Sequence, residues 1–266
     1  MDLGKRTRLN RIFSDPSGRL CSVAVDHFIG YQKGLPVGLT NVPETIKAVV
    51  AGRPDAITML KGMATSAWEP YAGTIPLIIQ SMMFTADDAV IELVARPEEV
   101  LRMGADAIAV AIGVLGPNEG NFFKLLNSVA EEAAPLGLPV MAHIYPRDFT
   151  NGARIIYDPA SIMWAVRAGI ENGADVIKVP FTGDSDSFRA IVETSPVPVV
   201  AAGGPRCETL TDALEMMVKV IASGARGATI GRNIWGMPDP AKAVVALKAV
   251  IHDGCGVDAA MKKAGL

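Results

Sequence analysis

The 266-residue chain has few cysteines and no long apolar segment. Its three cysteines, Cys21, Cys207 and Cys255, are odd in number and show no metal-ligand spacing, so we expect neither a disulfide framework nor a zinc site. No uninterrupted apolar stretch approaches the roughly 20 residues that a membrane-spanning helix needs. Residues 1–12 are charged and lack the apolar segment of a secretory signal. These absences predict a cytoplasmic protein with no membrane association, no disulfide and no zinc site.

A strong charge of one sign is also missing. The net charge is −3 and the charged residues of both signs are scattered along the chain, so no basic face for nucleic acid is visible. The basic residues near the N-terminus are Lys5, Arg6, Arg8 and Arg11. They are more typical of a solvated helix end than of a binding arm, and nucleic acid is not expected as a partner.

The composition that remains is that of a layered α/β protein. Half of the residues are hydrophobic and only 6% are aromatic, which is typical of parallel strands covered on both faces. Short β-rich runs alternate with longer amphipathic segments, and this alternation predicts a parallel sheet with right-handed crossovers. The eight β-rich runs are 22–27, 56–60, 77–82, 107–112, 139–145, 176–181, 198–204 and 228–233.

Eight such units predict a closed (β/α)8 barrel, or TIM barrel. This α/β fold typically needs about 250 residues, whereas an open doubly wound sheet usually has about five or six strands. No linker or break in composition marks a second domain, so residues 1–266 are expected to form one. Residues 1–20 are expected to close the bottom of the barrel as a helix and lead-in strand, and residues 240–266 to form the last helix and a tail.

A lysine stands inside one of the apolar runs. Lys178 lies between β-branched residues, and Pro180 marks the end of that predicted strand. Burial disfavours the charged ammonium, which lowers the pKa and frees the neutral amine to attack a carbonyl. The alternative is a lysine whose stem is buried while its ammonium reaches water. The position near the C-terminal end of a barrel strand is where Schiff-base enzymes keep their nucleophile.

Other polar residues follow the predicted strands at the same end of the barrel, where TIM-barrel active sites lie. They are Asp26, His27, Lys61, His143 and Tyr145. Alternation along their strand directs both His143 and Tyr145 into the barrel mouth, where either could transfer protons. Asp26 could bind substrate hydroxyls or act as a base. His27 is either a histidine packed between strand and helix or part of the site. Lys61 either lowers the pKa of Lys178 by like-charge repulsion, binds substrate, or is a solvated loop lysine.

Glycine-rich turns follow the last two predicted strands, the usual position of a phosphate site in a barrel. The first contains Gly203 and Gly204, and the second contains Gly231 followed by Arg232. Glycines let backbone N–H groups approach a phosphate, and an arginine adds a fork of donors. Glycines that only serve tight turns are the alternative. Two such turns at these two strands favour a phosphorylated small molecule as the ligand.

Several motifs occur in order and at the spacing of a known family. They are Val25-Asp26-His27, the segment 34–39, Tyr145-Pro146-Arg147, Ala174-Asp175-Val176-Ile177-Lys178, Gly203-Gly204 and Gly231-Arg232-Asn233. Across roughly residues 15–250 the chain resembles the class I aldolases of the DhnA/DeoC-like superfamily, typified by archaeal fructose-bisphosphate aldolase. This superfamily also contains 2-amino-3,7-dideoxy-D-threo-hept-6-ulosonate synthase and the thiolase of autoinducer-2 phosphate breakdown.

The resemblance implies a TIM barrel that uses no metal or other cofactor. Lys178 would form a Schiff base with a phosphorylated ketose, Tyr145 would transfer protons at the carbon–carbon bond, and Asp26 would assist at the hydroxyls. The backbone of the residues Gly203, Gly204, Gly231 and Arg232 would hold the phosphate, and homo-oligomers are usual in the family. Many members carry glycine where this chain has Phe28. The segment 28–33 is more similar to the thiolase and transferase branches, and in the thiolase-like branch His27 would take a catalytic part.

Three functions follow from these observations. The first is a lyase that makes or cleaves a carbon–carbon bond in a phosphorylated ketose through an imine at Lys178. The second is an acyl or aldol transferase that uses the same lysine with another acceptor, such as coenzyme A. The third is a non-catalytic barrel that binds sugar phosphates, against which the lysine and the neighbouring Tyr145 argue.

Overall fold

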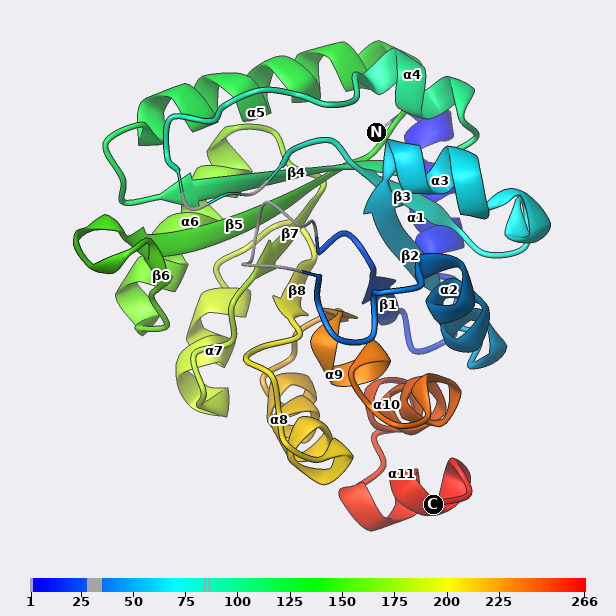
Figure 1. The fold of residues 1–266 in the computed structure, drawn as a ribbon. Coiled ribbons are helices and arrows are strands. Elements are labelled where there is room, and N and C mark those ends of the chain that lie inside the picture. The colour runs from blue at the N-terminus through cyan, green and yellow to red at the C-terminus, as the bar shows by residue number, and fades with distance from the viewer. Residues whose placement is uncertain (1, 28–34, 84, 86) are drawn as a thin grey trace.

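The computed structural model describes residues 2–27, 35–83, 85 and 87–266, and it confirms the expected (β/α)8 barrel. Figure 1 shows the strands at the centre with helices around them. The barrel strands are β1 (Leu20–Ala24), β2 (Ala56–Leu60), β3 (Leu77–Gln80), β4 (Ala107–Val114), β5 (Val140–Asp148), β7 (Val176–Val179), β8 (Val199–Ala202) and β9 (Gly227–Ile230). The short strand β6 (Arg154–Ile155) extends the upper end of β5 as an antiparallel neighbour.

The barrel closes because every barrel strand has a parallel neighbour on each side. The order of hydrogen-bonded strands is β4-β3-β2-β1-β9-β8-β7-β5, and a further pairing of β4 with β5 completes the ring. The surrounding helices are α2 (Val42–Ala51), α3 (Lys61–Ala67), α4 (Pro97–Arg102), α5 (Glu119–Ala133), α6 (Pro159–Glu171), α7 (Ser185–Val192), α8 (Leu210–Ala222), α9 (Arg232–Trp235), α10 (Pro240–Asp253) and α11 (Val257–Lys263). Short 3-10 turns occur at Glu69–Tyr71, Ala134–Leu136 and Phe149–Asn151.

The helices form where the sequence supplies both a cap and an apolar face. In α8 the Thr209 side chain accepts the backbone N–H of Asp212, and the Asp212 carboxylate accepts the backbone N–H of Thr209, a reciprocal capping box. Leu214, Met217 and Val220 of this helix are buried against the barrel. No helix in the described part of the chain is both long enough and apolar enough to span a bilayer.

The first helix covers the bottom of the barrel. In α1 (Leu3–Ile12) the side chain of Ile12 packs into the barrel interior together with Leu20 of β1. Lys5 Nζ lies 3.0 Å from Asp175 Oδ2, and the Arg11 guanidinium pairs with the Asp106 carboxylate. The basic residues near the N-terminus therefore pair in part with the acidic turns that precede the strands, and the helix end is not simply solvated.

The structure corrects several expected boundaries. The first strand ends at Ala24, so Asp26 and His27 lie in the segment after it. The last strand ends at Ile230, because residues Arg232–Trp235 turn into the single-turn helix α9. The segment expected to be one helix and a tail contains two helices, α10 and α11, separated at Gly254 by a left-handed cap that ends the first.

One glycine is required where β1 meets β9. Gly227 has φ +108°, and a Cβ added there would lie 2.0 Å from the Leu20 carbonyl oxygen. We expect Gly227→Ala to lower the free energy of unfolding by about 4 kcal/mol or more, because β1 and β9 must move apart to make room for the Cβ. Gly104 is the matched control, since it also has positive φ (+77°) but nothing within 4 Å of an added Cβ. Gly104→Ala should cost only about 1 kcal/mol. Equal shifts of the two urea-unfolding midpoints would contradict the steric argument.

Candidate functional site

Lys178 lies on the inner face of the barrel, near the C-terminal end of β7. It is 5% exposed, and its Cα is in register with His143 of β5 on one side and Val200 of β8 on the other. Val176, two residues earlier on the same strand, belongs to the apolar interior cluster. Because side chains alternate along a strand, Lys178 stands directly above this apolar layer.

A narrow cavity at the mouth brings Lys178 together with most of the expected site residues. Its lining includes Lys178, Tyr145 and His27, and also the two glycine turns with Arg232. Tyr157, which follows β6, lines the same cavity and was not singled out from the sequence. The cavity itself is small, about 50 Å³, but two larger cavities share residues with it. One of about 450 Å³ shares His27, and one of about 310 Å³ shares Tyr157.

The two glycine turns are held together by Asn233. Its Nδ2 donates to the carbonyl oxygens of Gly203 (2.7 Å) and Pro205 (2.9 Å), and Arg232 Nη2 donates to the carbonyl oxygen of Gly204 (3.2 Å). The N–H of Gly203 donates to the Thr229 carbonyl oxygen, so it is not available to a phosphate as the resemblance implied. Its missing side chain has another use, because a Cβ there would lie 2.9 Å from the Cα of Ile230.

Tyr145 lies on the inner face of β5, two residues beyond His143. Burial raises the pKa of the Tyr145 phenol, the negative charge of Asp26 raises it further, and the positive charge of Arg232 opposes both. The phenol is therefore protonated at neutral pH and can donate a proton or a hydrogen bond into the cavity.

Asp26 and His143 are joined through Gln80, which the sequence analysis did not identify. Gln80 is the last residue of β3 and only 3% exposed. Its Nε2 lies 3.2 Å from Asp26 Oδ2 and 3.2 Å from His143 Nδ1. The only sequence signal for this role is one polar residue at the end of the apolar run Leu77-Ile78-Ile79-Gln80.

His27 is packed against an aromatic ring and also lines the candidate site, and its part in the chemistry stays a prediction. Its ring packs edge-on against Trp235, with 5.2 Å between ring centroids, and it lines both the narrow cavity and its 450 Å³ neighbour. Burial lowers the pKa of His27 to about 4, with Asp26 opposing this shift and with Lys178 and Arg232 adding to it. The ring is neutral at neutral pH. A Cβ on Gly231 would lie 2.5 Å from its Cε1, so this glycine is what lets the ring sit there.

Lys61 is the first residue of α3 and lies apart from Lys178. Its ammonium contacts both carboxylate oxygens of Glu99, at 2.9 and 3.2 Å. The hydrogen bond from Lys61 is the largest cause of the lowered pKa of Glu99. Among the described cavities Lys61 lines the 450 Å³ one, together with Asp26 and His27. The structure therefore offers no support for an effect of Lys61 on Lys178, and it leaves Lys61 at the rim of the mouth.

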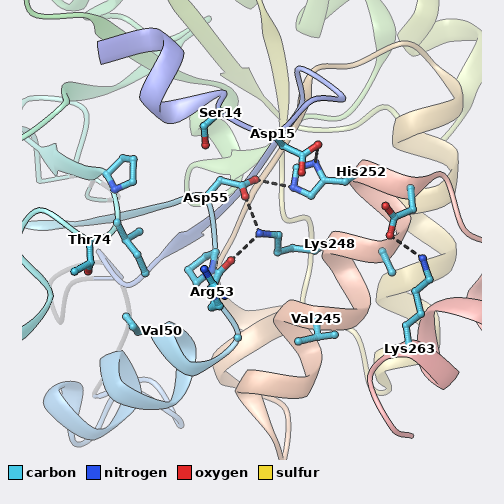
Figure 2. Close-up of a pocket in the computed structure, with 16 residues that line it drawn as sticks. Ser14, Asp15, Val50, Arg53, Asp55, Thr74, Val245, Lys248, His252 and Lys263 are labelled. Carbon is cyan, nitrogen blue, oxygen red and sulfur yellow. Dashed lines mark hydrogen bonds and ion pairs between the residues drawn. The ribbon is translucent and has the colours of Figure 1, made fainter. Parts of the chain in front are cut away.

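The largest described cavity, about 850 Å³, lies at the opposite end of the barrel. Figure 2 shows that Asp15, Asp55, Lys248 and His252 point toward one another. Asp55 contacts His252 Nε2 (2.8 Å) and Lys248 Nζ (2.9 Å), while His252 Nδ1 faces Asp15 (3.3 Å). Asp55 Oδ2 also accepts the backbone N–H of Cys21. These contacts tie the start of β1 to β2 and α10, which is a structural role, so the candidate site is the C-terminal mouth.

Two earlier expectations, the branch of the family and the absence of a bound metal, stay predictions. Phe28 and the segment 28–33, on which the similarity to the thiolase and transferase branches rests, lie outside the described residues, as does Gly34. Within the described ranges no three His, Cys, Asp or Glu side chains gather as the ligands of a metal ion would.

Comparisons with known proteins find aldolases and synthases of similar sequence and fold. Residues 20–237 match the DeoC/LacD family of aldolases. The chain is 33% identical to a 2-amino-3,7-dideoxy-D-threo-hept-6-ulosonate synthase of Halobacterium salinarum, over 100% of this chain and 98% of that protein. It is 30% identical to a 2-amino-4,5-dihydroxy-6-oxo-7-(phosphonooxy)heptanoate synthase of Streptomyces griseus, over 97% and 94%. An archaeal fructose-1,6-bisphosphate aldolase with its catalytic lysine bound to the carbinolamine intermediate is similar at TM-score 0.81 and 27% identity, over 93% and 99% of the two chains.

The neutral state of His27 predicts how the free energy of unfolding depends on pH. Its pKa is about 6.5 in the unfolded chain and about 4 in the folded one, so the unfolded chain takes up the proton first as the pH falls. The stabilisation is full above pH 6.5 and is lost as the pH falls toward 4, by about 3 kcal/mol. The advantage of the wild type over His27→Gln in free energy of unfolding should shrink by that amount from pH 7 to pH 4. Parallel curves of unfolding free energy against pH for the two proteins would contradict this.

Proposed function

The chain belongs to the DeoC/LacD family of aldolases, and we propose that it makes or cleaves a carbon–carbon bond in a phosphorylated ketose through a Schiff base at Lys178. The observation that carries this proposal is the narrow cavity at the mouth, where Lys178 faces Tyr145 and the turns at Gly204 and Gly231. In this proposal these residues supply a nucleophile, a proton donor and a phosphate cradle around one small volume. Neither a metal ion nor another cofactor is needed for this chemistry.

The proposed cleavage begins with attack of the Lys178 amine on the ketose carbonyl. Tyr145 protonates the carbinolamine oxygen, which leaves as water and gives a protonated imine. The imine then accepts the electron pair of the breaking carbon–carbon bond and becomes an enamine, while the neighbouring hydroxyl loses its proton and becomes the aldehyde. Protonation of the enamine carbon and hydrolysis of the imine release the second product. Synthesis is the reverse sequence.

Tyr145 suits both halves of this proton transfer. Burial and Asp26 keep the phenol protonated at rest, so it can act first as an acid. The nearby charge of Arg232 favours the phenolate, so the tyrosinate left after that step is stabilised and can accept the hydroxyl proton. Asp26 lies close enough to influence the phenol, and in this proposal it orients the hydroxyl that loses its proton.

The phosphate of the substrate is proposed to bind at the two turns. Gly204 has φ +75°, a conformation that L side chains rarely adopt, and Gly203 and Gly231 have no room for a Cβ. The Arg232 side chain crosses from one turn to the other through its bond to Gly204. His143, near Lys178, completes the substrate contacts.

A transferase is the second candidate, because both relatives described above are named synthases. In that case the same imine at Lys178 would deliver its fragment to a second carbonyl compound or to a thiol such as coenzyme A. Turnover that requires an added thiol or a second carbonyl substrate would favour the transferase. Ligand-dependent stabilisation without any turnover would favour a non-catalytic barrel that binds sugar phosphates.

A cytoplasmic location and a homo-oligomeric state are part of the same proposal. Leu115 is 45% exposed and Trp164 is 49% exposed, and both bond to the Glu119 carboxylate. Each is a large exposed apolar side chain that a second copy of the chain could cover. Sedimentation equilibrium would show whether the protein assembles.

The imine gives a direct prediction. Incubation with a phosphorylated ketose and borohydride should reduce the imine to a stable amine and raise the protein mass by the reduced adduct, on Lys178 only. Lys178→Ala should abolish both the adduct and turnover, while Lys47→Ala, a change at an exposed lysine of α2, should retain both. Mass spectrometry of the intact and digested protein checks this for each of a panel of ketoses. An adduct on another lysine, or a Lys178→Ala protein that still turns over, would contradict the mechanism.

Removal of the Tyr145 hydroxyl should slow proton transfer more than it slows attack by the Lys178 amine. Tyr145→Phe is expected to lower kcat by about 10²–10⁴-fold, the usual contribution of a positioned proton donor. Some borohydride adduct should persist, because the amine itself remains. The matched control is Tyr71→Phe, since Tyr71 lies in the 3-10 turn Glu69–Tyr71 and packs against Trp68 outside the mouth. If Tyr145→Phe and Tyr71→Phe had the same kcat, Tyr145 would have no part in proton transfer.

A further inference from the structure

The orientation of the Gln80 amide is fixed from two sides. Its Oε1 accepts the backbone N–H of Met82 at 3.2 Å, which only an oxygen can do. Its Nε2 lies 3.2 Å from Asp26 Oδ2, and a carboxylate oxygen requires a donor. The reversed amide would place its NH₂ group against the Met82 N–H and its oxygen against the Asp26 carboxylate. Both contacts therefore select the same orientation.

This orientation fixes the tautomer of His143. The second N–H of the Gln80 amide points at His143 Nδ1, 3.2 Å away, so that nitrogen must accept a hydrogen bond and carry no proton. The ring is neutral, because burial and the nearby Lys178 hold the pKa of His143 well below its ordinary value. A neutral ring with a bare Nδ1 carries its proton on Nε2.

The Nε2–H of His143 is left for a ligand. In the described part of the chain this nitrogen is fully buried and has no hydrogen-bond partner. His143 and Lys178 are register partners on adjacent strands, and both side chains are on the inner face of the barrel. A buried N–H without an acceptor is destabilising, and an acceptor brought in by the substrate would satisfy it.

We propose that Gln80 is a positioning residue, which holds His143 as the Nε2–H tautomer and orients Asp26 through the same amide group. His143 then acts as a hydrogen-bond donor to an oxygen of the substrate held at Lys178, and it does not act as a base. This inference rests on the proposed function for the identity of the acceptor, but the tautomer and its cause follow from the contacts of Gln80 alone.

The tautomer can be read directly by nitrogen NMR, because the chain has only three histidines. Protonated and bare ring nitrogens differ strongly in 15N shift. With 15N-labelled histidine, one ring should show a protonated Nε2 and a bare Nδ1 that does not titrate near neutral pH. His27→Gln and His252→Asn assign this ring to His143 by elimination. A His143 ring with its proton on Nδ1 in the wild type would overturn the proposal.

Two variants test the cause. In Gln80→Glu the carboxylate can only accept, so the proton of His143 is expected to move to Nδ1. In Gln80→Met the side chain can no longer donate a hydrogen bond to His143 Nδ1 or to Asp26. The single His143 tautomer should then give way to a mixture. The control is Ser81→Ala, since Ser81 is also buried and adjacent but bonds to the Ala109 carbonyl oxygen, away from His143. An unchanged His143 spectrum in Gln80→Met would contradict the proposal even if Gln80→Glu failed to fold.

Kinetics separate this inference from the proposed function. Gln80→Met should still form the borohydride adduct at Lys178, but kcat should fall about tenfold or more, the effect of one misplaced hydrogen bond. In the wild type the Nε2 shift of His143 should move when the substrate is trapped, and an unmoved shift would exclude His143 as the donor. If the wild type formed no adduct at all, the proposed function would fail, while the histidine spectra would still decide the role of Gln80.

Discussion

The site depends on the alternation of side chains along strands that close into a ring. The pairing of β4 with β5 completes that ring, so every second residue faces an interior that only its two ends connect to solvent. The composition of this interior changes from bottom to top. The lowest layer is apolar, the middle carries the buried hydroxyls of Ser22, Thr58 and Thr229, and the mouth carries the ionisable groups. A lysine near the C-terminal end of a barrel strand is thus placed where the apolar floor meets the polar mouth.

Burial at the mouth does more than hold side chains in place, because it also sets their protonation. It raises the pKa of Tyr145 and lowers the pKa of both His27 and His143. Three titratable groups around Lys178 are therefore neutral near pH 7, and each can offer a directional hydrogen bond without a competing charge. The charges that act on these groups come from Asp26, Arg232 and Lys178. In a site of low dielectric constant, each charge interacts more strongly with its neighbours than it would in water.

The sequence was sufficient for the features that local patterns encode. Alternating apolar runs predicted the barrel, and Lys178 stood out because a charge inside an apolar run is unusual. The glycine turns also followed from local chemistry, although the engaged N–H of Gly203 did not, since its acceptor Thr229 lies on the neighbouring strand. Gln80 was missed for the same reason. Its partners are 54 and 63 residues away in the chain, and only the closure of the barrel brings them together.

The electrostatics of Tyr145 link phosphate binding to proton transfer. Arg232 lowers the pKa of the phenol, whereas Asp26 and burial raise it. A phosphate bound at the turn of Gly204 would neutralise part of the Arg232 charge, and the phenol would then hold its proton more firmly. Substrate binding would thereby reinforce the acid form of Tyr145 that burial already favours, and the tyrosinate formed later would keep less of its stabilisation by Arg232. A ketose without a phosphate would leave the Arg232 charge uncompensated, so it would lower the pKa of Tyr145 relative to the phosphate complex as well as lose binding energy at this site.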